Sequence, residues 1–248
     1  MNLTRLAVFV LLSTLFAAAF GEPPKEIALQ ELIGERLGET NKVESVTQTP
    51  YLGLFEVRLE SGEYLYTDIE AKYVFAGHVF NSITHEDYTK TKIDAANMIQ
   101  FADLPLAFAI KTVKGDGRRI IATFEDPNCG YCKKFRRDLQ SVDNITVYTF
   151  LYNILNDDSA SKSKKIWCGN NPSKAWDDWM TKGVLPPESK LTDCATDPNE
   201  QVLALGKKLH IEGTPTIFFV DGSRVPGVLN KMILEEKLAK INKLPTTR

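Results

Sequence analysis

The stretch IIATFEDPNCGYCKKFRRDLQ (residues 120–140) places two cysteines, Cys129 and Cys132, two residues apart. The apolar run 120–124 before them predicts a strand, and residues 133–140 predict a helix. At the start of a helix, free backbone N–H groups and the helix dipole favour a thiolate. A thiolate with a second thiol nearby can carry out thiol–disulfide exchange. Half of a zinc knuckle has the same spacing, so this pair alone leaves both chemistries open.

The N-terminus has the pattern of a secretory signal. Arg5 supplies one positive charge, residues 6–20 form an uncharged apolar run, and Ala19-Phe20-Gly21 offers a cleavage site. We therefore expect a signal peptide over residues 1–21, the alternative being an anchor that stays attached. Formal net charge is −2, which gives no basic footprint for nucleic acid.

Export to an oxidising compartment changes how the four cysteines are interpreted. An even number predicts two disulfides, with Cys168–Cys194 as a structural bond. Closing that loop stabilises a fold by about 3–4 kcal/mol in the chain-entropy model. A four-cysteine zinc site would need a second close pair, and Cys168 and Cys194 are far apart in sequence. We expect neither a metal nor a cofactor.

Residues 22–84 predict a small N-terminal α+β domain. Its helix has an apolar stripe of Ile27, Leu29, Leu32, Ile33 and Leu37, and Gly38 is a plausible end. Three extended runs follow, at 54–59, 64–67 and 73–80, the first two joined by a hairpin turn. So small a core favours a partner, and dimerisation is the obvious one.

A mostly polar helix is expected over residues 87–101. We interpret 85–103 as a linker between domains; the alternative is that this helix packs on the second domain.

Residues 104–248 predict an α/β domain with the order strand, helix, strand, helical insertion, helix, hairpin, helix. The expected strands are 119–124, 145–152, 216–220 and an edge strand near 225–227. The expected helices are 133–139, 159–179 (which carries Cys168), 200–209 and 232–241.

This order, with CxxC at the first strand-to-helix turn and Gly213-Thr214-Pro215-Thr216 before the hairpin, resembles the thioredoxin fold. More narrowly, the chain resembles the DsbC/DsbG family of periplasmic protein disulfide isomerases. The resemblance rests on residues 124–132, 166–168, 175–178, 213–216 and 221–227. Gly130-Tyr131 between the cysteines is similar to the DsbC branch, whereas a Pro-Tyr pair would point to DsbG.

The resemblance implies a cystatin-like N-terminal dimerisation domain, a helical linker and a thioredoxin-like catalytic domain with a helical insertion. It also implies a homodimer with a shared cleft, a structural Cys168–Cys194 bond and reduction by a DsbD-type membrane partner. One departure concerns thioredoxin's buried acid, six residues before the first cysteine. Thr123 stands there, which puts a proton shuttle of that kind in doubt.

We expect Cys129 to be the nucleophile and Cys132 the less exposed resolving thiol, with a near-normal thiol character. Thr214 and Pro215 are expected opposite the cysteines, with a cis bond between them and Thr214 contacting the substrate backbone. Tyr131 either packs beside the substrate or is simply exposed. The basic run Lys133, Lys134, Arg136 and Arg137 is a solvated helix face in the favoured interpretation and an aid to the Cys129 thiolate in the other.

These features predict a periplasmic disulfide isomerase and reductase acting on misfolded secreted proteins with disulfides. One alternative is a dimeric holdase chaperone, whose apolar cleft matters more than its thiols. Others are a specialised reductase of sulfenic acids, an oxidase of nascent chains, and a purely structural CxxC disulfide.

Overall fold

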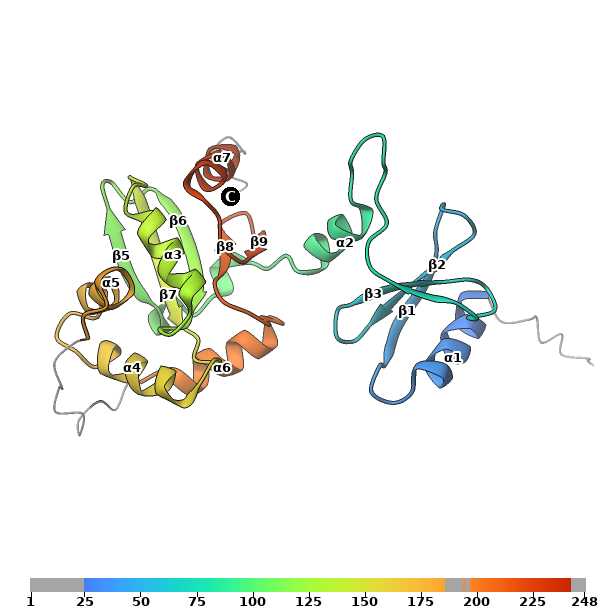
Figure 1. Cartoon of the computed structure of the whole chain (residues 1–248), viewed down its shortest axis with the longest axis horizontal. Coiled ribbons are helices and arrows are strands. Elements are labelled where there is room, and N and C mark those ends of the chain that lie inside the picture. The colour runs from blue at the N-terminus through green and yellow to red at the C-terminus, as the bar shows by residue number, and fades with distance from the viewer. Residues whose placement is uncertain (1–24, 186–193, 195–196, 242–248) are drawn as a thin grey trace, which may run out of the picture. The chain divides into compact units, whose positions relative to one another are not determined.

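The computed structural model describes residues 25–185, 194 and 197–241, which form two compact units (Figure 1). The predicted signal peptide, residues 1–21, lies outside the described residues. Across the described residues, no helix combines the length and the apolar character needed to cross a lipid bilayer.

The first unit is a helix on a four-stranded sheet. Helix α1 (Lys25–Leu37) precedes strands β1 (Val43–Gln48), β2 (Phe55–Leu59), β3 (Tyr64–Thr67) and β4 (Val74–Ala76), which neighbour one another in that order. Leu29 and Ile33 of α1 are buried in one core with Val57 and Leu59 of β2. Ile27 was expected in this stripe but is 49% exposed, because it lies at the open first turn of the helix.

Two elements of the first unit differ from expectation. Strand β1 was not predicted, because its sequence VESVTQ is polar and buries only Val46. The third predicted strand, 73–80, is reduced to Val74–Ala76, where all three residues are exposed. Gly77 follows with φ +141°, a conformation that takes the chain out of the strand.

The segment predicted as a linker contains a shorter helix than expected. Helix α2 spans Tyr88–Ala96, is capped by Asp87 and buries Thr89 alone among its residues. Two single turns follow, η1 (Phe101–Asp103) and η2 (Leu106–Phe108). The Ile99 N–H donates to Gly222 O at 3.1 Å, and Phe101 and Leu106 pack on the core of the second unit. The chain is therefore attached to the second unit from residue 99 onward.

The second unit is a five-stranded sheet in the order β5-β7-β6-β8-β9. Its strands are β5 (Ile110–Lys114), β6 (Arg119–Glu125), β7 (Ile145–Leu151), β8 (Thr216–Phe219) and β9 (Arg224–Pro226). Only β6 and β7 run parallel, and the other pairs are antiparallel. Strand β5, whose alternating sequence IKTVK exposes Val113, was not predicted.

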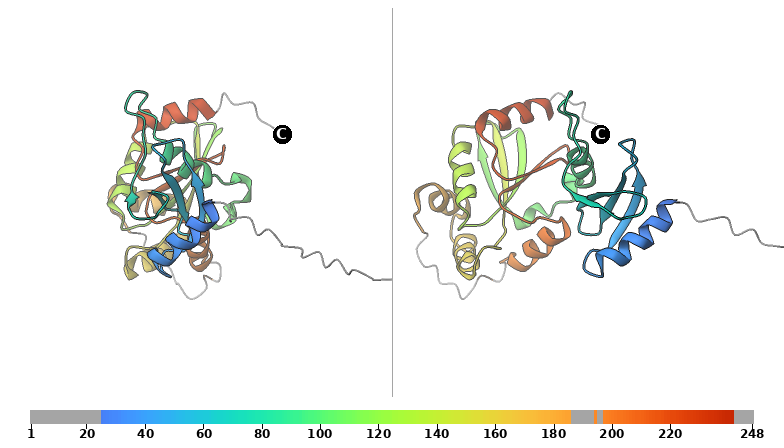
Figure 2. Two further views of the ribbon diagram at one scale, coloured as in Figure 1. Left: turned by 90° about the vertical axis from the view of Figure 1, so that its right-hand side faces the viewer. Right: turned by 45° about the vertical axis from the view of Figure 1, so that its right-hand side comes forward.

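Alternation along the strands divides the core into two layers. Ile121 of β6 faces helices α3 (Gly130–Leu139) and α7 (Lys231–Ile241), with Phe135 and Leu234 in the same cluster. Phe124 faces the other layer, which includes helix α6 (Asn199–Lys208) and the segment from Leu104. Figure 2 shows this sheet and its helices from two further directions.

The helical insertion consists of two helices where one, 159–179, was expected. Helix α4 spans Asp157–Trp167, and α5 spans Pro172–Lys182. The break follows from sequence chemistry, since Asn171 caps α5 and Pro172, at its first position, cannot continue a preceding helix. Ile166, Trp176 and Met180 turn inward and are fully or almost fully buried.

The packing of α6 against the residue after β7 predicts that substitution of Gly206 lowers the stability of the second unit. A Cβ at Gly206 would lie 2.2 Å from the ring of Tyr152, whose hydroxyl is held by Ile211 O at 3.0 Å. G206A should therefore destabilise the second unit by about 1–3 kcal/mol, despite a gain of about 1 kcal/mol in helix propensity. Urea unfolding followed by tryptophan fluorescence measures this, because Trp167, Trp176 and Trp179 all lie in the second unit.

The matched control is G34A in helix α1, where an added Cβ meets nothing within 4 Å. It should leave the tryptophan transition unchanged and should not lower the stability of α1 measured by far-UV circular dichroism. A G206A variant as stable as the wild type would show that α6 and Tyr152 are not packed as described.

Candidate active site

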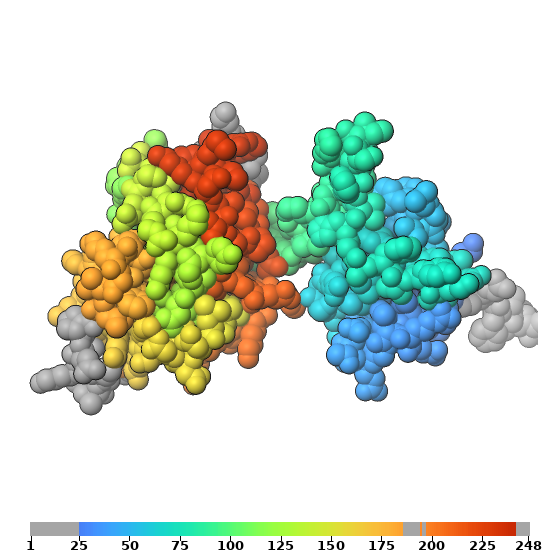
Figure 3. All heavy atoms as spheres, in the orientation of Figure 1, coloured from blue at the N-terminus to red at the C-terminus, as the bar shows by residue number. Residues whose placement is uncertain are grey.

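The two cysteines of the CGYC motif lie where β6 passes into α3. Cys129 is the N-cap residue of α3, and its Sγ accepts the backbone N–H of Cys132 at 3.1 Å. Cys132 lies in the first turn and is completely buried, whereas Cys129 retains 5% exposure. Figure 3 shows α3 at the surface of the second unit, between the insertion and α7. A side chain that accepts hydrogen bonds at a helix N-terminus is favoured as an anion.

Asp126 fixes the loop between β6 and the cysteines. Its buried carboxylate accepts the N–H of Asn128 and the hydroxyl of Ser159, both at 2.8 Å. It also accepts the N–H groups of Ile154 at 3.0 Å and Leu155 at 3.1 Å. One side chain thus ties the active-site loop to the segment after β7 and to helix α4. This role of Asp126 was not predicted from the sequence, because the only local signal is the Asp-Pro pair typical of a turn.

The Gly-Thr-Pro segment lies directly opposite Cys129. The Cys129 thiol donates to Thr214 O at 3.3 Å, across 85 positions of sequence. The Thr214–Pro215 peptide bond is cis, and Pro215 O accepts the N–H of Gly227 at 2.7 Å. Pro215 is buried, Thr214 is half-buried and Gly213 is exposed, so a bound molecule can reach Gly213 and Thr214.

The environment makes the two thiols chemically unequal. The pKa of Cys129 is lowered to about 6, chiefly by its interaction with Cys132 and further by Thr214 and the N–H groups of Cys132 and Tyr131. Burial raises the pKa of Cys132, and the nearby Cys129 and Glu125 raise it further. The near-normal thiol predicted for Cys132 is therefore wrong. Cys132 lies in an apolar cluster with Leu151, Ile166 and Trp176, and such surroundings disfavour the charged form.

Basic and aromatic side chains border the motif. Tyr131 is 70% exposed, and Trp179 of α5 donates its indole N–H to Pro127 O at 2.7 Å. The ammonium groups of Lys133 and Lys162 lie 4.4 and 4.6 Å from the centre of the Trp179 ring. Trp179 and Lys162 were not singled out from sequence, because only the folding of the insertion brings them to the motif.

The basic run after the motif is only partly a solvated face. Lys134 and Arg137 are exposed, and Lys134 pairs with Asp138 at 2.7 Å. Arg136 is 3% exposed, so for this residue the interpretation as a solvated face is wrong. It lies on the same side of α3 as Cys132, Phe135 and Leu139, which are also buried.

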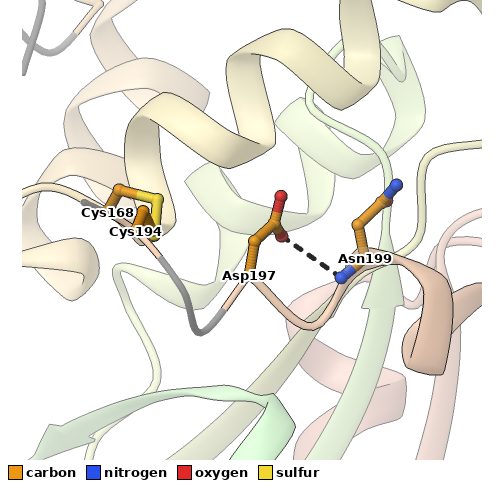
Figure 4. The surroundings of a disulfide bond; sticks show 4 residues. All are labelled: Cys168, Cys194, Asp197 and Asn199. Atoms are coloured by element: carbon orange, nitrogen blue, oxygen red, sulfur yellow. Dashed lines mark hydrogen bonds between the residues drawn. A yellow bond between two sulfur atoms is a disulfide. The ribbon is translucent and has the colours of Figure 1, made fainter. Parts of the chain in front are cut away.

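The second pair of cysteines forms a disulfide in the insertion. Cys168, at the end of α4, is bonded to Cys194, with 5.7 Å between the Cα atoms (Figure 4). After Cys194 the chain turns at Asp197, whose side chain accepts the N–H of Asn199 at 3.2 Å, and α6 begins there. Cys129 and Cys132 are free thiols.

The inequality of the two thiols predicts a single ionisation at moderate pH. Thiolate absorbance near 240 nm of the reduced protein should rise once, with a midpoint near pH 6, because the pKa of Cys129 is lowered to about 6 and that of Cys132 is raised. C129S should abolish this rise. A midpoint near 8.5, the ordinary value for cysteine, would contradict the geometry described for Cys129.

Comparison with known proteins agrees with both halves of the chain. Residues 106–242 match the family model of a thioredoxin-like domain, and residues 20–90 match that of the disulfide bond isomerase protein N-terminal domain. The expected fold class, an N-terminal domain of this kind followed by a thioredoxin-like domain, is confirmed.

Individual relatives identify the family more specifically. The probable thiol:disulfide interchange protein DsbC of Bordetella parapertussis is 46% identical over 87% of this chain and 75% of its own length. DsbC of Escherichia coli K12 is 31% identical over 51% of this chain and 53% of its own. A crystal structure of a disulfide interchange protein from Neisseria gonorrhoeae matches with a TM-score of 0.52 and 35% identity, over 55% of this chain and 97% of that one. The expected resemblance is thereby confirmed: the chain belongs to the DsbC family of thiol:disulfide interchange proteins.

Proposed function

We propose that this chain is an exported disulfide isomerase and reductase that attacks non-native disulfides of secreted proteins through Cys129. The observation that supports this proposal most strongly is the difference between the two thiols at the N-terminus of α3. Cys129 accepts a backbone N–H and has a lowered pKa, while Cys132, one turn on, is buried and stays protonated. An ionised Cys129 can attack a substrate disulfide, and a protonated, buried Cys132 resolves the resulting mixed disulfide slowly. This gives a second substrate thiol time to react.

The chemistry follows from that contrast. The Cys129 thiolate attacks one sulfur of a substrate disulfide, forms a new S–S bond and releases the other substrate sulfur as a thiolate. If a second substrate thiol then attacks the mixed disulfide, Cys129 leaves as a thiolate, and the substrate is isomerised with no net redox change. If Cys132 attacks first, the two cysteines become a disulfide, and the substrate is reduced by two electrons.

Thr214, Pro215 and Tyr131 are the proposed substrate-binding residues. Thr214 is half-buried and its carbonyl lies 3.3 Å from Cys129 Sγ, so an extended chain beside it would bring its sulfur to the nucleophile. Pro215 holds this segment against the β9 turn through the hydrogen bond from Gly227. Tyr131 offers a largely exposed aromatic ring next to Cys129 for contact with misfolded chains.

Homodimerisation through the first unit is the proposed assembly. Strand β4 is the last strand of its sheet, and Tyr73, Val74 and Phe75 are 60%, 43% and 55% exposed. An apolar strand at a sheet edge can pair with another strand and is seldom left open in native proteins. A second copy of the same edge would cover both.

The proposed compartment is the periplasm, reached by cleavage of residues 1–21. The structural disulfide Cys168–Cys194 suits an oxidising space. Every net reduction leaves Cys129 and Cys132 oxidised, so sustained reductase activity requires an electron donor, for which a DsbD-type membrane protein is proposed.

A holdase chaperone is the second candidate, favoured by exposed apolar side chains of the second unit, such as Tyr131 and Leu155, which lie outside the β4 edge. It can coexist with the enzyme, because a surface that binds misfolded chains serves both. The thiols separate them: C129S should keep any suppression of aggregation and lose disulfide rearrangement.

Refolding of a scrambled multi-disulfide protein in glutathione buffer tests the enzyme. The wild type should restore the native disulfides, and C129S should lose this activity entirely, because the other free thiol in the described residues, Cys132, is completely buried. C132S should still form mixed disulfides but should lose net reduction of insulin. Absence of rescue by the wild type would sink the isomerase and leave the holdase or a specialised reductase.

Sedimentation of V74D tests the dimer. A carboxylate on β4 would meet its symmetry mate across the interface, so dimer dissociation should rise by about tenfold or more. V113D is the matched control, since Val113 is 53% exposed on β5, the edge strand of the other sheet. Equal behaviour of the two variants would exclude the β4 edge as the interface.

A further inference from the structure

A buried ion pair lies next to the thiols, and it has no role in the attack by Cys129 or the resolution by Cys132 as proposed above. Glu125, the last residue of β6, is completely buried, and its Oε1 lies 3.9 Å from Nη1 of Arg136, which is 3% exposed. Glu125 Oε1 also accepts the hydroxyl of Thr123 at 2.7 Å. Glu125 Oε2 and two nitrogens of Arg136 have no hydrogen-bond partner within the described part of the chain. A buried pair so poorly satisfied is costly to a fold, which favours a chemical reason for keeping it.

Strand alternation directs Glu125 toward the helix that carries the thiols. Ile121 and Glu125 are an even number of residues apart on β6, and Ile121 packs against α3. Leu151 is the β7 residue in register with Glu125, and it shares a cluster with Cys132. On α3, Cys132 and Arg136 are four residues apart and both buried, so they lie on one helical face. Glu125, Arg136 and Cys132 therefore meet in the same layer.

Among the residues that the structure describes, four ionisable side chains interact with this carboxyl. Helix α3 contributes Arg136, Cys129 and Cys132, and α5 contributes Asp177, whose Oδ1 lies 3.7 Å from Arg136 Nη2. The neighbouring strand β7 contributes only the hydroxyl of Thr149, 3.4 Å from that of Thr123. Burial raises the pKa of Glu125, the Cys129 thiolate raises it further, and Arg136 and Thr123 act in the opposite direction.

We propose that the Glu125 carboxylate accepts the proton of Cys132 when Cys132 attacks the mixed disulfide, and that Arg136 is the positioning residue that keeps this carboxylate ionised. The inference rests on the proposed function, since it concerns the resolving step of that reaction. Thr123 stands at the position of thioredoxin's buried acid. In this proposal Glu125, two residues further along the same face of β6, takes the place of that acid.

The charges change in the direction this step needs. In the free enzyme, the Cys129 thiolate repels negative charge on Glu125. Once Cys129 is in a mixed disulfide it is neutral, so this repulsion is lost and the pKa of Glu125 falls from its value in the free enzyme. The proton then passes from Cys132 Sγ to Glu125, the Cys132 thiolate attacks Cys129 Sγ, and the bond from Cys129 to the substrate breaks. The substrate sulfur leaves as a thiolate, and the cysteine pair is oxidised by two electrons.

A pocket borders the buried pair on its Arg136 side. Arg136 and Asp177 both line this pocket of about 280 Å³ beside β5 and β7, whereas Glu125 does not. The Asp177 side chain is 47% exposed, so the Arg136 side of the pair lies close to the surface.

Single-turnover reduction of a disulfide peptide carrying a fluorophore and a quencher tests the proposal. Acid quenching and mass analysis separate the attack by Cys129 from the resolution by Cys132, at pH values from 5 to 9. E125Q should leave attack within about threefold and slow resolution at pH 7 by about 10²-fold. Its resolution rate should then rise with pH in proportion to hydroxide. R136M should shift the rise of the resolution rate to higher pH, because Glu125 then lacks its cation.

Two further variants keep this test independent of folding. E125Q/R136M removes both charges together and should show the E125Q profile without an unpaired buried cation. E56Q makes the same change at a glutamate buried in the first unit and should match the wild type.

An unchanged profile in E125Q, or a resolution rate lowered equally at every pH, would overturn the proposal. Wild-type protein that forms no mixed disulfide at all would instead overturn the proposed function, so the two failures are distinguishable.

Discussion

The buried carboxylate of Asp126 is the constraint on which the active site depends. Four hydrogen bonds join it to the loop before Cys129, to the segment after β7 and to α4. Strand β6 alone would fix the start of that loop but not its path. Because these bonds lie inside the protein, they are stronger than their equivalents in water, and losing any partner would leave a buried polar group unsatisfied. The orientation of α3, and with it the position of Cys129 against Thr214, follows from this arrangement.

The functional contrast between the two thiols is produced by a displacement of less than one helical turn. Cys129 lies at the N-cap, where backbone N–H groups point to its sulfur, and Cys132 lies where the insertion covers it with Ile166 and Trp176. The insertion is thus part of the electrostatics of the site as well as of the fold. Since α4 and α5 supply this cover, the chemistry of Cys132 is set by residues more than thirty positions away in sequence.

The central strands and the edge strand β9 could be predicted from the sequence, whereas the edge strands β1 and β5 could not. Strands β6, β7 and β8 are buried on both faces and read as continuous apolar or β-branched runs. Strands β1 and β5 lie at sheet edges with polar alternation, which a loop can also show. The CGYC motif and Thr214-Pro215 were found because their residue types carry the chemistry. Glu125 was missed because a glutamate followed by an aspartate looks like a solvent-exposed pair until the helix α3 that covers it is in place.

The disulfide in the insertion has a consequence for how the chain itself is made. The bond joins Cys168 to Cys194, the next cysteine in the sequence, and the two free thiols, Cys129 and Cys132, are also consecutive cysteines. Under the proposed export, the N-terminus crosses the membrane first and each pair emerges in order, so an oxidant that joins neighbouring cysteines as they emerge makes no wrong bond. A chain with the proposed isomerase function would therefore carry a cysteine pattern that needs no correction in its own biosynthesis.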